Sequence, residues 1–248
     1  MDFALAAPFG AIIGSFLNVV AYRLPRGESL AWPGSRCTSC GEAVRSYDNV
    51  PVVSWLVLRG RCRHCGDKIS AQYPVVELLT ALVFGAIVLV RGVRPELALE
   101  LPFAALLIAV AFIDLEHRIV PNKLLLPAAG WAIGVGALVA LPSLPEALIA
   151  GAAAFTFLLI AAVAHPAGMG MGDVKLAGVM GLYLGLSVVP ALLVAFLAGS
   201  VVGVVLIASR GSAARKTGVP FAPFLAFGAL VGLLAGPELI DLYTRNFL

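Results

Sequence analysis

Long apolar stretches follow one another along almost the whole of this 248-residue chain, with short polar segments between them. A helix needs about 20 mostly apolar residues to cross the hydrocarbon core of a bilayer. Backbone groups in lipid must form their hydrogen bonds within their own segment, and the alternating pattern of a β-barrel is missing, so we expect helices. The eight expected helices span residues 3–22, 75–90, 101–115, 124–141, 147–164, 174–186, 188–209 and 221–240.

The composition agrees with a lipid environment. Hydrophobic residues make up 60% of the chain and charged residues only 12%, whereas about a quarter of the residues of a soluble domain are charged. The first apolar stretch has no basic residue before it and continues to about Tyr22, which is too long for a signal peptide. We therefore expect it to be retained, and the expected fold is an all-α polytopic membrane protein with about eight transmembrane helices.

The basic residues are distributed unequally between the two sides of this arrangement. If the loop 23–73 faces the cytosol, 14 of the 17 Lys and Arg residues lie in cytosolic segments, and the positive-inside rule favours that orientation. Omitting one helix would move the loop with Arg210, Arg215 and Lys216 to the outside, so a count other than eight stays open. The expected regions are a first transmembrane helix (1–22), a cytosolic four-cysteine loop (23–73) and a transmembrane core of about seven helices (74–248).

All four cysteines lie in the loop 23–73 as two Cys-x-x-Cys pairs. The spacing between the pairs, 21 residues, is slightly longer than usual for zinc sites. Two such pairs can still offer four thiolates tetrahedrally to zinc, and a reducing cytosol disfavours the alternative of disulfides. His64 is a further possible ligand, although four thiolates already complete the coordination. We expect a structural zinc site, a zinc knuckle, formed by Cys37, Cys40, Cys62 and Cys65.

Two aspartates lie at the ends of expected helices. Asp114 is at the end of the stretch 101–115, and Asp173 follows Gly170-Met171-Gly172 at the start of 174–186. Two membrane crossings separate them, so we expect both at the same boundary, where acids are costly and often functional. Two carboxylates close enough to share a proton can hydrolyse a peptide bond, because one activates water while the other polarises the carbonyl.

Simpler interpretations of these acids remain open. Asp173 could have the purely structural role of stabilising the positive N-terminal end of its helix. Asp114 could pair with Arg118 one turn further along. Glu77 and Glu116 are weaker candidates, because each can be solvated or paired near a boundary.

Two other classes of protein compete with a peptidase. A transporter could move protons or cations with Asp114 and Asp173, but its site would be expected near the bilayer midplane, often between inverted repeats, and no repeat is evident. A non-enzymatic scaffold could dock secretion machinery through a zinc loop, but it leaves the pair of acids unexplained.

Taken in order, the motifs resemble those of the prepilin peptidase family of membrane aspartic proteases, which carry a GxGD motif. GxGD alone is a weak motif, but the ordered set is specific and covers nearly the whole chain. The matching segments are 14–20, 22–25, the four-cysteine loop with 48–56 and 59–62, 73–77, the segment around Asp114, 170–173 and 219–224.

The resemblance implies an activity and a location. Asp114 and Asp173 would be the catalytic pair, cleaving the leader peptides of type IV prepilins and pseudopilins at the cytosolic face of a bacterial inner membrane. Members with the cysteine loop usually also N-methylate the new amino terminus with S-adenosylmethionine, for which the sequence indicates no contact residues. A role in type IV pili or type II secretion follows, with membrane lipid as the surroundings and no nucleic acid as a partner.

The chain departs from the family pattern at two positions. Asn122 follows Val120-Pro121 where the family usually has an acid, and we expect this to alter substrate contact without abolishing cleavage. Ala222 replaces a usual glycine in Pro220-Phe221-Ala222-Pro223, and we expect it to tighten packing and leave the chemistry unchanged.

Overall fold

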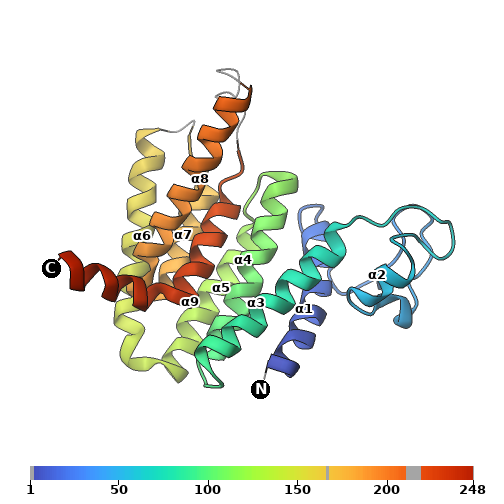
Figure 1. The fold of residues 1–248 in the computed structure, drawn as a ribbon, viewed down its shortest axis with the longest axis horizontal. Coiled ribbons are helices and arrows are strands. Elements are labelled where there is room, and N and C mark those ends of the chain that lie inside the picture. The colour runs from blue at the N-terminus through green and yellow to red at the C-terminus, as the bar shows by residue number, and fades with distance from the viewer. Residues whose placement is uncertain (1–2, 166–167, 211–218, 248) are drawn as a thin grey trace. The chain divides into compact units, whose positions relative to one another are not determined.

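The computed structural model describes residues 3–165, 168–210 and 219–247, and over these residues the chain is helical, without a regular strand (Figure 1). Arg215 and Lys216, which were predicted to lie in a cytosolic loop, are outside the described residues. Each expected apolar stretch forms a helix. The long helices are α1 (Phe3–Arg23), α3 (Gln72–Arg91), α4 (Leu97–His117), α5 (Asn122–Val139), α6 (Leu144–Ala164), α7 (Met171–Leu184), α8 (Val188–Arg210) and α9 (Ala222–Phe247); the short elements are η1 (Ser46–Asn49), α2 (Val53–Val57), η2 (Leu141–Ser143) and η3 (Gly185–Ser187).

The described chain has seven helical stretches long and apolar enough to cross a membrane, against the expected eight or so. The difference comes from α7. Its 14 residues give a length of about 21 Å, which is shorter than the roughly 30 Å of a hydrocarbon core. On its own, α7 is therefore too short to count as a membrane span. It counts together with α8 as one stretch, Met171–Ser209, although the chain turns at Gly185 (φ +55°) between the two helices. The predicted fold class, an all-α polytopic membrane protein, is confirmed.

The chain divides into two compact units, and the first ends at Arg94. Its centre is the pair of helices α1 and α3, whose backbones approach closely because glycines of α1 face α3. A Cβ atom on Gly14 would lie 2.7 Å from the Glu77 Cα, so only glycine fits there. The rest of this unit is the loop that carries the cysteines. The division into a first transmembrane helix, a cysteine loop and a transmembrane core, with boundaries after residues 22 and 73, stays a prediction.

The second unit begins at Pro95 and contains α4 to α9, which run side by side in Figure 1. Its short helix α7 contacts α4, α5, α6 and α9. Val174 and the segment Leu176–Gly181 of α7 are buried, as expected for a helix that is apolar on all sides. The core of this unit therefore surrounds the helix that begins with the GxGD motif.

Candidate functional site

Asp114 lies in the last turn of α4 and is only 5% exposed. The helix ends here because Arg118 adopts a left-handed conformation (φ +57°), and its N–H donates to the Asp114 carbonyl oxygen over 2.9 Å. The side chain is held separately. Its Oδ2 accepts a hydrogen bond of 3.1 Å from the backbone N–H of Ala222, the first residue of α9. The orientation of this carboxylate is thus fixed by a helix 108 residues away.

Asp173 is the third residue of α7, and extended Gly170 is the residue that caps this helix. The Asp173 N–H donates to the Gly170 carbonyl oxygen over 3.1 Å, and the Asp173 carboxylate accepts a hydrogen bond from the Gly170 N–H. The carboxylate thus forms one half of a capping box, the bond from the acid of the first turn back to the N–H of the capping residue, and Gly170 has no side chain to form the other half. The interpretation of Asp173 as a helix-start acid is therefore correct as a description of its local structure.

The structure brings the two acids together. Helices α4 and α7 are in contact, and Asp114 is near enough for its charge to act on Asp173. The alternative partner of Asp114, Arg118, interacts with it only through longer-range attraction, and no ion pair between the two is formed in the described structure. A pair of carboxylates at the ends of two helices can share a proton and activate a water molecule.

The GxGD turn is packed against the loop that follows α4. A Cβ atom on Gly172 would lie 2.8 Å from the Cβ of Val120, so this glycine is required for the close approach of the two segments. A Cβ on Gly170 would lie 3.5 Å from the Asp173 Oδ2 and 3.9 Å from the Gly172 N, and both are ordinary contacts. The room next to Gly172 is therefore filled by Val120, whereas Gly170 leaves space beside the Asp173 carboxylate.

Asn122, the first departure from the family pattern, has a partner within the chain. Its Oδ1 accepts a hydrogen bond of 3.1 Å from the Lys175 Nζ of α7. Together with the contact between Val120 and Gly172, this bond joins the start of α5 to the start of α7. An acid at position 122 would form an ion pair with the same lysine.

We expect Asn122→Asp to stabilise the protein by no more than about 1 kcal/mol, because the pair is exposed to solvent. The gain should vanish when Lys175 is replaced by methionine. Thermal unfolding of the wild type, both single variants and the double variant in detergent measures the coupling. A gain that persists in the Lys175→Met background would show that the lysine is not the partner of the new acid.

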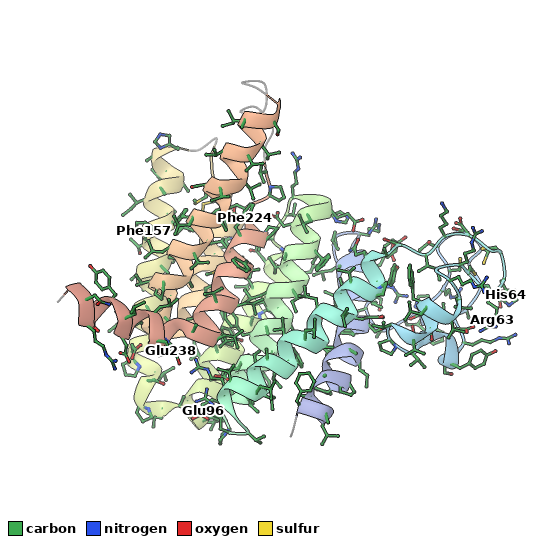
Figure 2. All side chains as sticks on the ribbon, viewed as in Figure 1. Arg63, His64, Glu96, Phe157, Phe224 and Glu238 are labelled. Carbon is green, nitrogen blue, oxygen red and sulfur yellow. The ribbon has the colours of Figure 1, made fainter. Side chains whose placement is uncertain are left out.

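The four predicted cysteines also come together. Their Sγ atoms all lie within 4.8 Å of one another, and the Sγ atoms of Cys37 and Cys65 are 3.8 Å apart. Four sulfurs placed about 2.3 Å from one central metal would be separated by about 3.8 Å. His64 is exposed and not part of the cluster, and Figure 2 shows it beside Arg63 on this loop.

The cluster is built from two equivalent hairpins. In the first, Gly41 N–H donates to the Cys37 carbonyl oxygen, and in the second Gly66 N–H donates in the same way to Cys62. Both glycines have positive φ, +72° and +71°, which a residue with a side chain rarely adopts. Isolated bridges close the hairpins at equivalent positions, Arg36 with Ala43 and Arg61 with Lys68.

The thiols of this cluster do not ionise alike. Backbone N–H groups of Cys40 and Ser39 lower the pKa of the Cys37 thiol to about 6. The Asp67 N–H favours the Cys65 thiolate, but desolvation and the other three thiols outweigh it and raise the pKa of Cys65 to about 12. Four thiolates therefore need a cation to offset their mutual repulsion, and a divalent metal ion suits this donor set.

Comparisons with known proteins cover both units. Residues 9–91 match the bacterial peptidase A24 N-terminal domain, and residues 101–208 match the type IV leader peptidase family. A Pseudomonas putida protein named prepilin leader peptidase/N-methyltransferase is 33% identical over 98% of this chain and 92% of its own length. Proteins of the same name from Aeromonas hydrophila and Bacillus subtilis (strain 168) are each 34% identical, over 99% and 96% of this chain and 95% and 96% of their own lengths. No solved structure matches the chain.

Fold and site together define a multi-pass helical protein of the inner membrane, with two carboxylates held at helix ends and a four-cysteine cluster able to hold a metal. The chain belongs to the type IV leader peptidase family, as the sequence motifs predicted.

One residue that contacts the catalytic candidates was not identified from the sequence. Ala222 was interpreted as a packing position, but its N–H binds Asp114. The available signal was its place at the start of a helix, where backbone N–H groups lack partners within the helix.

Proposed function

We propose that this protein cleaves the leader peptides of type IV prepilins and pseudopilins and N-methylates the new amino terminus. The observation that carries the proposal is the meeting of Asp114 and Asp173 at the ends of two helices. The near full-length similarity to proteins named prepilin leader peptidase/N-methyltransferase supports both activities. No finding favours a transporter.

In this proposal Asp114 and Asp173 are the catalytic pair and hold one proton between them. The ionised carboxylate removes a proton from a water molecule, which attacks the scissile carbonyl carbon, while the protonated one polarises the carbonyl oxygen. The carbon–nitrogen bond then breaks, and the carboxylic acid formed from the first carboxylate gives its proton to the leaving amine. The Ala222 N–H donates to the Asp114 Oδ2, and we assign the other oxygen of that carboxylate to the water or the substrate.

We place both carboxylates and the cysteine loop on the cytosolic side. The support is the distribution of the Lys and Arg residues, most of which lie in the loops on that side of the expected arrangement. Cleavage there would release the leader in the cytosol, just before the substrate's hydrophobic helix. The processed subunits would serve a type IV pilus or a type II secretion system.

We assign the four-cysteine cluster to structural zinc. Cys37, Cys40, Cys62 and Cys65 would complete a tetrahedral site and leave no open position for catalysis. The methyl donor for the second activity would be S-adenosylmethionine, a substrate that supplies the methyl group.

The proposal is tested with the purified protein in detergent, a prepilin and S-adenosylmethionine. We expect mass spectrometry to find a shortened chain that carries one methyl group on its new amino terminus. An intact prepilin after prolonged incubation would refute the peptidase, and a shortened chain with an unmodified terminus would refute the methyltransferase.

The hydrogen bond from Ala222 gives a more specific prediction. Proline is tolerated in the first turn of a helix, so Ala222→Pro removes the N–H with little harm to α9. Losing a hydrogen bond to a charged group costs about 1.5–3 kcal/mol, so we expect cleavage to slow roughly tenfold to a hundredfold.

The matched control is Ala222→Gly, which keeps the N–H and should cleave at nearly the wild-type rate. Initial rates of prepilin cleavage, measured at equal amounts of folded protein, compare the three. Equal rates for Ala222→Pro and Ala222→Gly would show that this N–H does not matter.

A further inference from the structure

The first unit holds a buried acid that peptide cleavage does not use. Glu77 of α3 is only 7% exposed. Its Oε2 accepts a hydrogen bond of 2.7 Å from the Val52 N–H, and the Ser15 side chain of α1 also forms a hydrogen bond with the carboxylate. A charged group is costly to bury, so its presence in this helix pair calls for a role.

The segment that Glu77 holds is strained. Val52 has φ +61° and ψ −49°, a conformation that is rare for a β-branched residue. Strained residues of this kind persist where the surrounding structure holds them, and they often accompany functional sites. Here the bond to Glu77 draws the segment before α2 onto the helix pair.

A cavity of about 290 Å³ adjoins the same two contacts. Its wall includes Ser15, which bonds to Glu77, and Pro51, which directly precedes Val52. Asn49 adds an amide group to this part of the wall. Glu77 does not line the cavity, but it is hydrogen-bonded to Ser15, which does.

The rest of the cavity is apolar along α1 and ends at a cation. Ile12, Phe16 and Val19 line it, and the first two are 60% and 49% exposed. Arg23 closes the far end, where its Nη atoms donate to the carbonyl oxygens of Ser29 and Gly34 over 3.0 and 3.1 Å. Eight residues of helix separate Ser15 from Arg23, which is about 12 Å, so the positive end is well away from Glu77.

We propose that this cavity receives the amino-terminal end of the cleaved substrate for N-methylation, with its α-amino group at Ser15 and its first apolar side chains along Ile12, Phe16 and Val19. This inference rests on the proposed function and adds the site of its second activity. Because the Ser15 hydroxyl donates to Glu77, its oxygen lone pairs are free to accept a hydrogen bond from the amino group. Glu77 is a positioning residue that orients Ser15 and offsets the positive charge of the amine.

The chemistry needs such an arrangement. The α-ammonium group must first give up a proton to water, because only a neutral amine has a lone pair for attack. Its nitrogen then forms a bond to the methyl carbon of a sulfonium donor, the carbon–sulfur bond breaks, and the electron pair stays on sulfur. The secondary ammonium that results gives up a proton to water. A hydroxyl that accepts one N–H bond fixes the direction of the nitrogen lone pair.

Binding is the first test. Two peptides reproduce the amino-terminal end of a mature pilin, one with a free and one with an acetylated α-amino group, and fluorescence anisotropy measures their binding to the full-length protein in detergent. We expect the wild type to bind the free peptide about tenfold more tightly, as for a hydrogen bond to a charged group. Ser15→Ala and Glu77→Gln should lose this preference.

Thr80→Val is the matched control. Thr80 lies one turn further along α3, is fully buried, and its hydroxyl donates to the Val76 carbonyl oxygen of the same helix. This variant should keep the preference for the free peptide. Equal binding of the two peptides by the wild type, or a preference kept by both Ser15→Ala and Glu77→Gln, would overturn the assignment.

Turnover separates this site from the peptidase. With a prepilin and S-adenosylmethionine, Ser15→Ala and Glu77→Gln should cleave at close to the wild-type rate but methylate about tenfold more slowly. Unchanged methylation, or an equal loss of cleavage and methylation in both, would contradict the proposal. A wild type that neither cleaves nor methylates would instead defeat the proposed function, whereas wild-type activity with unaffected variants defeats only this site.

Discussion

Asp114→Asn and Asp173→Asn are each expected to reduce prepilin cleavage at least about a thousandfold, the upper part of the range for a lost general acid or base. Asparagine has nearly the shape of aspartate, and at position 114 its oxygen can still accept the Ala222 N–H. It can neither take a proton from water nor give one to the carbonyl oxygen. The chemistry should therefore be lost while the fold is kept.

Asp241→Asn is the control for these variants. Asp241 lies on α9 and is exposed, so the same substitution there should leave cleavage unchanged. Cleavage is followed by mass spectrometry at equal amounts of membrane-inserted protein. Full processing by either Asp114→Asn or Asp173→Asn would remove that residue from the catalytic pair.

Removal of the metal from the cysteine loop is expected to unfold that loop. Structural zinc contributes about 10–16 kcal/mol of binding energy in small zinc domains, and this loop has few buried apolar side chains to replace it. Cys62→Ser should therefore abolish stoichiometric zinc and make the loop sensitive to protease. Elemental analysis and limited proteolysis measure the two effects.

Ser39→Ala serves as the comparison for Cys62→Ser. Ser39 lies between the cysteines of the first hairpin and bonds to Asp67 of the second, but it supplies no sulfur. Its loss should leave one zinc per chain. Purified wild type without zinc, or a Cys62→Ser loop that resists protease as well as wild type, would contradict the assignment.

The helices could be predicted because a backbone surrounded by lipid must form its hydrogen bonds internally, and a helix does so within one segment. Every apolar stretch became a helix, and the ends differ by up to four residues except at the C-terminal end of α9, which runs seven residues further than expected, to Phe247. The short helix α7 was harder to place, because its polar start and the turn at Gly185 are decided by packing against neighbouring helices. Hydropathy gives the number of apolar stretches, but not whether each one reaches both boundaries.

The site was predictable only in part. Counting the crossings between Asp114 and Asp173 predicted that both would reach one boundary, and the structure brings them together. The donor to Asp114 could not be anticipated, because the pairing with Ala222 depends on how α9 docks. Glu77 was expected to be solvated or paired with another charge. It is instead buried against a backbone N–H of the cysteine loop, a contact that no local pattern encodes.

The two cysteine hairpins have a consequence for the membrane helices on either side. The chain between α1 and α3 is 48 residues long, and a metal that joins Cys37 to Cys65 would bypass 27 of them. Shortening a flexible connection by about half lowers the entropy cost of bringing its ends together by only about 0.6 kcal/mol. This is a small contribution compared with the close packing of Gly14 against α3. In a cell short of zinc, α1 and α3 would therefore still insert into the membrane and pair, and only the loop that connects them would be unfolded.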